Sequence, residues 1–169
     1  MTESPTVEEI KKLFEEFATA PRRFFELCSG VPVIKLQRPV ADGKWSPLQI
    51  IQHLVGCDKE ALLPRIESML AVDNPDLPAY DQDAWMRMHG SVNDRMAVQL
   101  IDEFARLREK SSILLFDLSL DHWLRRGQHE ELGEITILDL CRNFTRHDTH
   151  HYQQIARFID PSDAGAESG

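Results

Sequence analysis

Apolar residues recur at helical spacing in four long stretches of the chain, which are separated by segments that contain proline and glycine. Spacings of three and four residues place such side chains on one face of a helix, and that face packs into a core. We expect these helices over residues 7–28, 46–71, 92–118 and 136–158. Four amphipathic helices in a chain of this length predict an all-α fold, a four-helix bundle with long connecting loops.

Three of these helices begin with a capping box, in which a hydroxyl residue is followed three positions later by a side chain that reaches back to the backbone. The pairs are Thr6 with Glu9, Ser46 with Gln49, and Thr136 with Asp139. Pro21 lies inside the first helix and removes a hydrogen-bond donor, so we expect a kink or a restart near Ala20. Pro64 lies inside the second helix, where a bend can occur.

The connections are predicted to be irregular. Residues 31–44 should form an extended connection, and residues 120–134 a loop or a short hairpin. Residues 73–90 are too irregular for a long helix, although 81–88 fit a short one, and we expect this segment to cover one end of the bundle. Residues 6–160 are thus one domain, between a flexible N-terminus of residues 1–5 and a small, polar, disordered tail of residues 161–169.

The charge of the chain excludes some partners. The 169 residues carry a formal net charge of -9 at pH 7, and the basic residues are scattered among more numerous acids. Nucleic-acid binding requires clustered Lys and Arg, so we predict neither a nucleic-acid partner nor a membrane surface. The N-terminus lacks a signal-peptide core and no run approaches about 20 apolar residues, which predicts a cytoplasmic protein. The cysteines Cys28, Cys57 and Cys141 lack paired spacing and should be reduced and buried.

The last predicted helix carries three of the seven histidines. At about 100° per residue, His147 and His151 fall on the same apolar stripe as Leu140 and Ile155, whereas His150 points to solvent. Two imidazoles one helical turn apart point in the same direction, as a metal requires of such a pair. This helix is therefore both a core helix and the candidate active site.

His53 lies at the edge of the apolar face of the second helix. In a simple up-and-down bundle the second and fourth helices run parallel, and a stagger of one to two turns would bring His53 to His147 and His151. Three neutral imidazoles would bind zinc, nickel or ferrous iron and leave a coordination position for water or substrate. The alternative is that these histidines only satisfy hydrogen bonds to backbone or carboxylate groups.

Two residues next to the candidate ligands have two interpretations each. Asp148 can fix the tautomer of a ligand ring, or it can form a salt bridge to a neighbouring helix or subunit. Cys57 lies one turn after His53, where it can be a fourth ligand; the favoured interpretation is a small buried hydrophobe that forms a wall of the cavity.

Further histidines and arginines occur outside the long helices. His129, Arg125 and Arg126 lie in the loop that enters the last helix and can either reach a substrate or remain solvated. His89 and His122 have no supporting context and are expected at the surface.

The motifs and their order resemble the DinB-like (DinB/YfiT-like) superfamily of bacterial four-helix metalloproteins. They are GKWSPLQIIQHL near the start of the second helix, a tryptophan-containing segment after it, GQHEELGEIT before the last helix and HDTHHYQQI within it. The resemblance spans nearly the whole chain. It implies a bundle that binds one divalent metal through His53, His147 and His151.

The resemblance also implies a class of activity. Members with known activities resemble transferases and isomerases that use low-molecular-weight thiols such as bacillithiol or mycothiol, and many others are described as metal-dependent hydrolases. We therefore expect a metal-dependent enzyme with zinc, nickel or iron, and a thiol-dependent S-transferase that acts on a small-molecule substrate as the first choice. The alternatives are a metal-dependent hydrolase and a non-catalytic, dimeric metal-binding stress protein. Family members commonly form homodimers, which we expect here as well.

Overall fold

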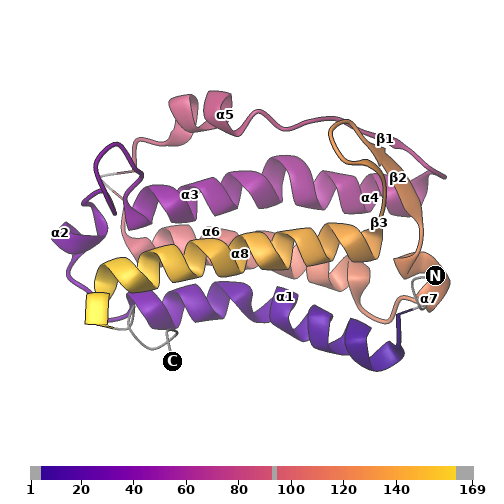
Figure 1. Ribbon diagram of the computed structural model, residues 1–169, viewed down its shortest axis with the longest axis horizontal. Helices are drawn as coiled ribbons and strands as arrows, with labels where there is room; N and C mark the ends of the chain where they lie inside the picture. Colours follow the sequence, from indigo (N-terminus) through magenta and orange to yellow (C-terminus); the bar gives the residue numbers. More distant parts are fainter. Residues whose placement is uncertain (1–4, 93–94, 163–169) are drawn as a thin grey trace.

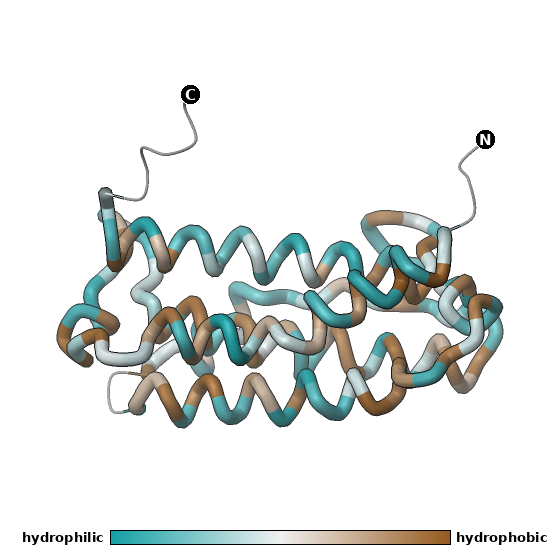
Figure 2. The backbone as a smooth tube through the Cα atoms, turned by 90° about the horizontal axis from the view of Figure 1, so that it is seen from below, coloured by the Kyte–Doolittle hydropathy of each residue, from teal (hydrophilic) through white to brown (hydrophobic). Residues whose placement is uncertain are grey.

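The computed structural model describes residues 5–92 and 95–162, and it is a four-helix bundle (Figure 1). The first long helix is α1 (Val7–Cys28), the third is α6 (Ala97–Leu115) and the fourth is α8 (Ile137–Ile159). The second consists of three consecutive segments, namely α3 (Pro47–Cys57), the π-helical turn η1 (Asp58–Leu62) and α4 (Leu63–Ala71). Hydrophobic and hydrophilic positions alternate along these helices (Figure 2), as expected for amphipathic helices with one buried face. The predicted fold class is confirmed.

The connections contain short elements. There are three short helices, α2 (Val33–Leu36), α5 (Gln82–His89) and α7 (Leu120–Trp123). There are also three short strands, β1 (Asp76–Leu77), β2 (Arg126–His129) and β3 (Gly133–Thr136). Strand β2 pairs parallel with β1 and antiparallel with β3 in a small sheet of order β1-β2-β3. The predicted short helix and hairpin are therefore present, whereas the extended connection expected over residues 31–44 contains the short helix α2.

The long helices do not simply alternate in direction. Helices α1 and α8 run one way along the bundle, and α3–α4 and α6 run the other way (Figure 1). The packing at the two ends of the bundle agrees with these directions. Each of two hydrophobic clusters contains side chains from one end of every long helix. The first cluster includes Ile10, Met69, Leu115 and Leu138, and the second includes Phe24, Leu48, Leu100 and Ile155. The expectation that the second and fourth helices run parallel is therefore wrong.

The long connection between α4 and α6 accounts for this topology. It runs back from the end of α4 along the side of α3 (Figure 1), until the carbonyl of Gly90 accepts a hydrogen bond from Gln49 Nε2 at 3.3 Å. Helix α6 therefore starts at the same end as α3. We expected residues 73–90 to cover an end of the bundle, but they cover the side of α3. Gly56 permits the close approach, since a Cβ there would lie 2.6 Å from the Tyr80 hydroxyl and 2.7 Å from the Trp85 ring.

Pro21 does not break the first helix, and α1 extends from residue 7 to 28 without a restart. A proline has no N–H, so the carbonyl of Phe17, four residues earlier, loses its helical donor. Arg108 Nη1 donates to this carbonyl at 2.9 Å and replaces the missing hydrogen bond. Pro64 follows η1, in which the N–H of Leu63 bonds to the carbonyl of Asp58, so the irregularity expected in the second helix takes the form of a π-turn.

The ends of the elements follow the capping signals of the sequence. All three predicted capping boxes are formed. The third helix begins at residue 97, later than expected, and ends at residue 115. The predicted flexible ends, residues 1–5 and 161–169, fall almost entirely outside the described residues. Among the helices that the structure describes, none combines the length and the apolar character needed to cross a membrane.

Candidate metal centre and adjoining cavity

His53 from α3 and His147 and His151 from α8 converge in the bundle, and one ring nitrogen of each lies within 4.8 Å of the other two. Nε2 of His147 lies 3.1 Å from Nε2 of His53 and 3.2 Å from Nε2 of His151. Because α3 and α8 run antiparallel, the start of α3 lies near the end of α8, and His53 lies close to His147 and His151. At about 1.5 Å per residue, His53 lies about 9 Å after the start of α3, and the other two rings lie about 15 Å before the end of α8.

The geometry of the cluster fits a divalent metal. Bonds from zinc to histidine nitrogen are about 2.0–2.1 Å long, so neighbouring nitrogens of a tetrahedral site lie about 3.3 Å apart. The two Nε2 distances are close to this value. Burial is the main cause that lowers the pKa of His53 to about 3, and the pKa values of His147 and His151 to about 4. The three rings are therefore neutral at pH 7, which is the state that binds a metal.

Neighbouring side chains orient the rings. Nδ1 of His151 lies 3.1 Å from Oε1 of Gln154. Because an amide oxygen only accepts hydrogen bonds, Nδ1 carries the ring proton and Nε2 presents its lone pair to the cluster. The Trp45 ring packs against His53 with the ring centroids 4.9 Å apart. The rings of His53 and His151 are thus held by side chains that are not themselves in the cluster.

The two residues with alternative interpretations can now be assigned. Oδ2 of Asp148 forms a salt bridge of 2.7 Å with Nη1 of Arg108 on α6, so it pairs with a neighbouring helix. Cys57 lies beside His53, with its sulfur 3.6 Å from Nε2 and 3.7 Å from Nδ1, but outside the histidine cluster of the described residues. Burial raises the pKa of its thiol, which is neutral at pH 7. It forms a wall of the site. All three cysteines are free and buried, as predicted.

A buried ion cluster beside the histidines was not predicted. Arg108 is only 1% exposed. It donates from Nε and Nη2 to the carboxylate of Asp58, at 2.8 and 2.9 Å, and from Nη1 to Asp148. Its guanidinium also lies over the rings of Phe17 and Phe104. One positive charge faces two carboxyl groups, and burial raises the pKa of both aspartates. This cluster ties α8 to η1 and α6 next to the histidines.

A cavity of about 310 Å³ adjoins the histidine cluster. His147 and Cys57 form its wall on the side of the cluster, and Ala61 and Phe144 supply apolar wall. His129, for which the sequence left open whether it reaches a substrate or is solvated, lies in this wall and is buried. A small molecule bound in this cavity would therefore lie directly beside His147, a candidate metal ligand.

The two arginines that precede His129 in the same loop have structural roles. Arg125 donates to the carbonyls of Met69 and Val72 at the end of α4 and pairs with Asp73. Arg126 forms a salt bridge with Glu134 across the β2–β3 hairpin. Of the three loop residues, only His129 reaches the cavity.

Two other polar residues of the cavity wall, Arg65 of α4 and Tyr80 of the connection that follows β1, were not singled out by the sequence. The remaining histidines lie where the sequence predicted. His150 is exposed on α8, and His89 and His122 are exposed on short helices of the connections.

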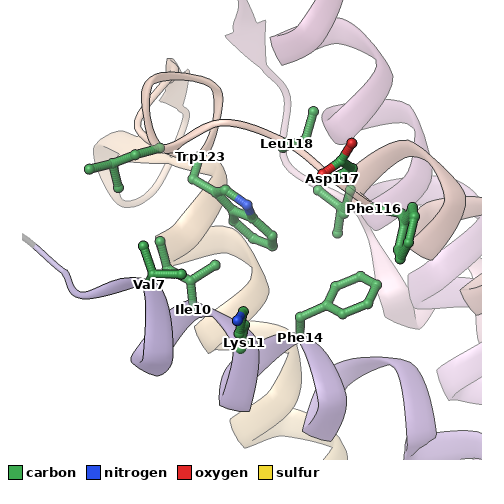
Figure 3. Close-up of a pocket in the computed structure, with 10 residues that line it drawn as sticks. Val7, Ile10, Lys11, Phe14, Phe116, Asp117, Leu118 and Trp123 are labelled. Carbon is green, nitrogen blue, oxygen red and sulfur yellow. The ribbon is translucent and has the colours of Figure 1, made fainter.

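A second cavity, of about 330 Å³, lies where α1 begins (Figure 3). Phe14, Phe116 and Trp123 extend into this region from α1, from the residue after α6 and from α7. Its wall is mainly apolar, with Lys11 and Asp117 as the charged members. It therefore offers a hydrophobic surface, whereas the candidate chemistry lies at the histidine cluster.

Three neutral histidines from facing helices, beside a cavity, are the arrangement from which helical-bundle proteins build metal sites. Comparison with known proteins agrees with this class of helical-bundle protein. The sequence model of the DinB superfamily matches residues 16–155. The chain therefore belongs to the DinB superfamily, which confirms the resemblance of its motifs.

Relatives of known name cover most of the chain. Over 154 residues it is 20% identical to "Putative metal-dependent hydrolase OB0413" of Oceanobacillus iheyensis. This alignment covers 90% of this chain and 87% of that protein. Over 156 residues it is 23% identical to "Putative metal-dependent hydrolase YfiT" of Bacillus subtilis, with 90% and 85% covered.

A solved structure has the same fold. It is that of YfiT from Bacillus subtilis, described as "a probable metal-dependent hydrolase with an unusual four-helix bundle topology". The two structures superpose with a TM-score of 0.82 at 20% sequence identity, over 94% of this chain and 90% of that chain. At this identity the likeness establishes the fold.

Proposed function

We propose that this chain is a metal-dependent enzyme in which one divalent metal, bound by His53, His147 and His151, activates a nucleophile for attack on a small molecule. The observation that carries the proposal is the meeting of three neutral imidazoles, with Nε2 distances of 3.1 and 3.2 Å, beside a cavity that His147 lines. Three protein ligands are typical of catalytic zinc sites, where the fourth position belongs to water or substrate. Imidazole donors suit zinc, nickel and iron.

A divalent metal in this cluster would supply a Lewis acid that lowers the pKa of a water or thiol bound to it. The chain's own residues prepare the site for this role. Gln154 fixes the tautomer of His151, and Trp45 covers the ring of His53. Burial raises the pKa of the Cys57 thiol in the metal-free chain, and its sulfur lies outside the histidine cluster of the described residues.

Hydrolysis, with water as the nucleophile, is the reaction that the names of the relatives support. Thiol transfer, with a low-molecular-weight thiol as cosubstrate, is the second candidate. The specific feature in its favour is the apolar wall that Ala61 and Phe144 form next to His147, since such a surface suits a thiol better than a hydrated ion. A non-catalytic metal-binding protein is the alternative from a different class.

Spectroscopy of the cobalt-substituted chain distinguishes these candidates. For a hydrolase, acetate should perturb the visible cobalt spectrum, and mercaptoethanol should not produce a sulfur-to-metal charge-transfer band. For a thiol transferase, the band should appear on addition of the thiol. If neither added ligand changes the spectrum of a chain that holds one cobalt ion, the site is closed to exogenous ligands and the enzymatic proposal is wrong.

We also propose, on the resemblance of the motifs, that the chain forms a homodimer and is cytoplasmic. Sedimentation equilibrium of the untagged chain would test the dimer. A molecular mass of one chain over the micromolar range would contradict it.

A further inference from the structure

Arg65 is a buried cation in the cavity wall, and the exposed Glu131 of the same wall acts on its charge only from beyond salt-bridge distance. Only 8% of its surface is exposed, and its one hydrogen bond runs from Nη2 to the carbonyl of Pro78 at 2.8 Å. It forms no salt bridge with any residue of the ranges 5–92 and 95–162. Burial lowers the pKa of the guanidinium. Arg108, by contrast, is buried with two carboxylates. A buried charge is costly unless it is paired, so Arg65 is suited to an anion from outside the chain.

His129 adds a hydrogen-bond donor to the same wall. Its Nδ1 accepts from the backbone N–H groups of Glu131 and Leu132, at 3.2 and 3.3 Å. The ring proton must therefore be on Nε2, which is the donor that the ring offers to a ligand. Burial lowers the pKa of His129, so the ring is neutral at pH 7 and keeps this tautomer.

Tyr80 adds a second donor. Its hydroxyl is buried and has no hydrogen-bond partner among the residues that the structure describes. Gly56 allows this hydroxyl to lie against α3, where a larger residue would displace it. A buried hydroxyl without a partner costs free energy that a ligand acceptor would recover.

These three groups select the chemistry of the ligand. A guanidinium, an imidazole N–H and a phenol in one wall match a ligand that carries acceptor oxygens and one negative charge. A single planar guanidinium matches a carboxylate in charge and shape, whereas a phosphate carries more charge than one arginine balances. Glu131 is the acidic member of the lining, and it is exposed at the rim. The cavity of about 310 Å³ has the size of a small-molecule site.

We propose that this cavity binds the carboxylate of a small organic acid, with Arg65 as its counter-ion and with Tyr80 and His129 as further donors. The remainder of the acid then extends toward His147 and the candidate metal centre, because these residues line one cavity. The inference rests on the proposed function, since it names the substrate class of the same cavity.

Calorimetric titration with benzoate, its neutral analogue benzamide and inorganic phosphate tests the inference. Binding is measured on the metal-free and on the zinc-loaded chain. Benzoate should bind the metal-free chain at least about tenfold more tightly than benzamide, because a hydrogen bond between a guanidinium and a carboxylate is stronger than one to a neutral amide. Tighter binding of phosphate than of benzoate would overturn the carboxylate assignment.

Variants locate the binding group. Arg65→Met should weaken benzoate binding at least about tenfold and leave benzamide binding unchanged. Arg106→Met is the matched control, because Arg106 is an exposed arginine of α6, and it should bind benzoate as the wild type does. Tyr80→Phe should weaken benzoate binding several-fold at unchanged stability, since the hydroxyl has no partner to lose within the described part of the chain. If Arg65→Met does not fold, benzoate binding by Arg65→Lys and Tyr80→Phe tests the inference instead. Wild-type benzoate affinity in both of these variants would overturn the inference.

The two proposals fail in different ways. If benzoate binds only the zinc-loaded chain, and binds Arg65→Met equally well, the carboxylate lies on the metal and the inference is wrong while the proposed function stands. If the chain binds no metal but binds benzoate through Arg65, the proposed function is wrong and the inference stands.

Discussion

The burial of three histidine rings determines, at the scale of single residues, how metal affinity depends on pH. Protons compete with a metal for imidazole nitrogen only near or below the pKa of the ring. Because the pKa values of His53, His147 and His151 lie at about 3 to 4, the rings are already neutral at pH 6. Zinc affinity, measured by competition with a chelator, should therefore change less than about twofold between pH 8 and pH 6.

Three ordinary histidines provide the contrast. If each of the three rings had a pKa of about 6.5, protonation between pH 8 and pH 6 would weaken the zinc affinity of the site roughly 65-fold. A loss of that size in the wild-type chain would show that the rings are not buried as neutral groups.

The histidines could be found from the sequence, but the charged residues around them could not. His147 and His151 share a helix, so their spacing places them on one face. Arg108, Asp58 and Arg65 also occupy the phase of the apolar stripes, for each follows a buried apolar residue by four positions. Those apolar residues are Phe104, Leu54 and Ala61. A charge at such a position was the available signal. The partners of Arg108 and Asp58 come from other helices, and Arg65 forms no salt bridge in the described part of the chain, so local spacing does not reveal the role of these charges.

At the scale of elements, Arg108 connects all four long helices. From α6 it reaches the carbonyl of Phe17 in α1, Asp58 in η1 and Asp148 in α8. Arg108→Leu leaves two buried carboxyl groups without a counter-ion and should destabilise the chain by about 3–5 kcal/mol in urea unfolding. Arg106→Leu, on the exposed side of the same helix, should change stability by less than about 0.5 kcal/mol. Similar losses in both variants would show that the ion cluster does not stabilise the bundle.

The bounds of most elements could be predicted because capping signals are local, whereas the direction of the helices could not. Ser46 and Thr136 mark helix starts through side chains three residues away. The path of residues 72–92 depends instead on contacts with distant elements, such as the pairing of β1 with β2 and the contact of Gly90 with Gln49. The periodicity of apolar residues likewise does not predict that Tyr80 and Trp85 pack closely against Gly56. The sequence therefore predicted which helices meet, but not which ends are adjacent.

At the scale of the whole molecule, the metal should stabilise a bundle that folds without it. The two hydrophobic clusters that join the long helices are built from side chains other than the three histidines. Free metal at a hundredfold excess over its dissociation constant adds roughly 2.7 kcal/mol. Chelation should therefore lower the melting temperature by about 5–10 °C and leave the helical circular dichroism at 20 °C unchanged. Loss of the helical signal on chelation would instead identify a structural metal.

The most direct measurement is the metal content of the untagged chain and of two variants of one helix. His147 and His150 both lie on α8, but His147 points into the cluster and His150 is exposed. The wild type and His150→Ala should each hold one equivalent of a divalent metal per chain after dialysis, as measured by plasma mass spectrometry. His147→Ala should hold almost none, because two imidazoles remain of three. Equal metal content in the two variants, or a wild type without bound metal, would contradict the assignment of His53, His147 and His151 as the metal site.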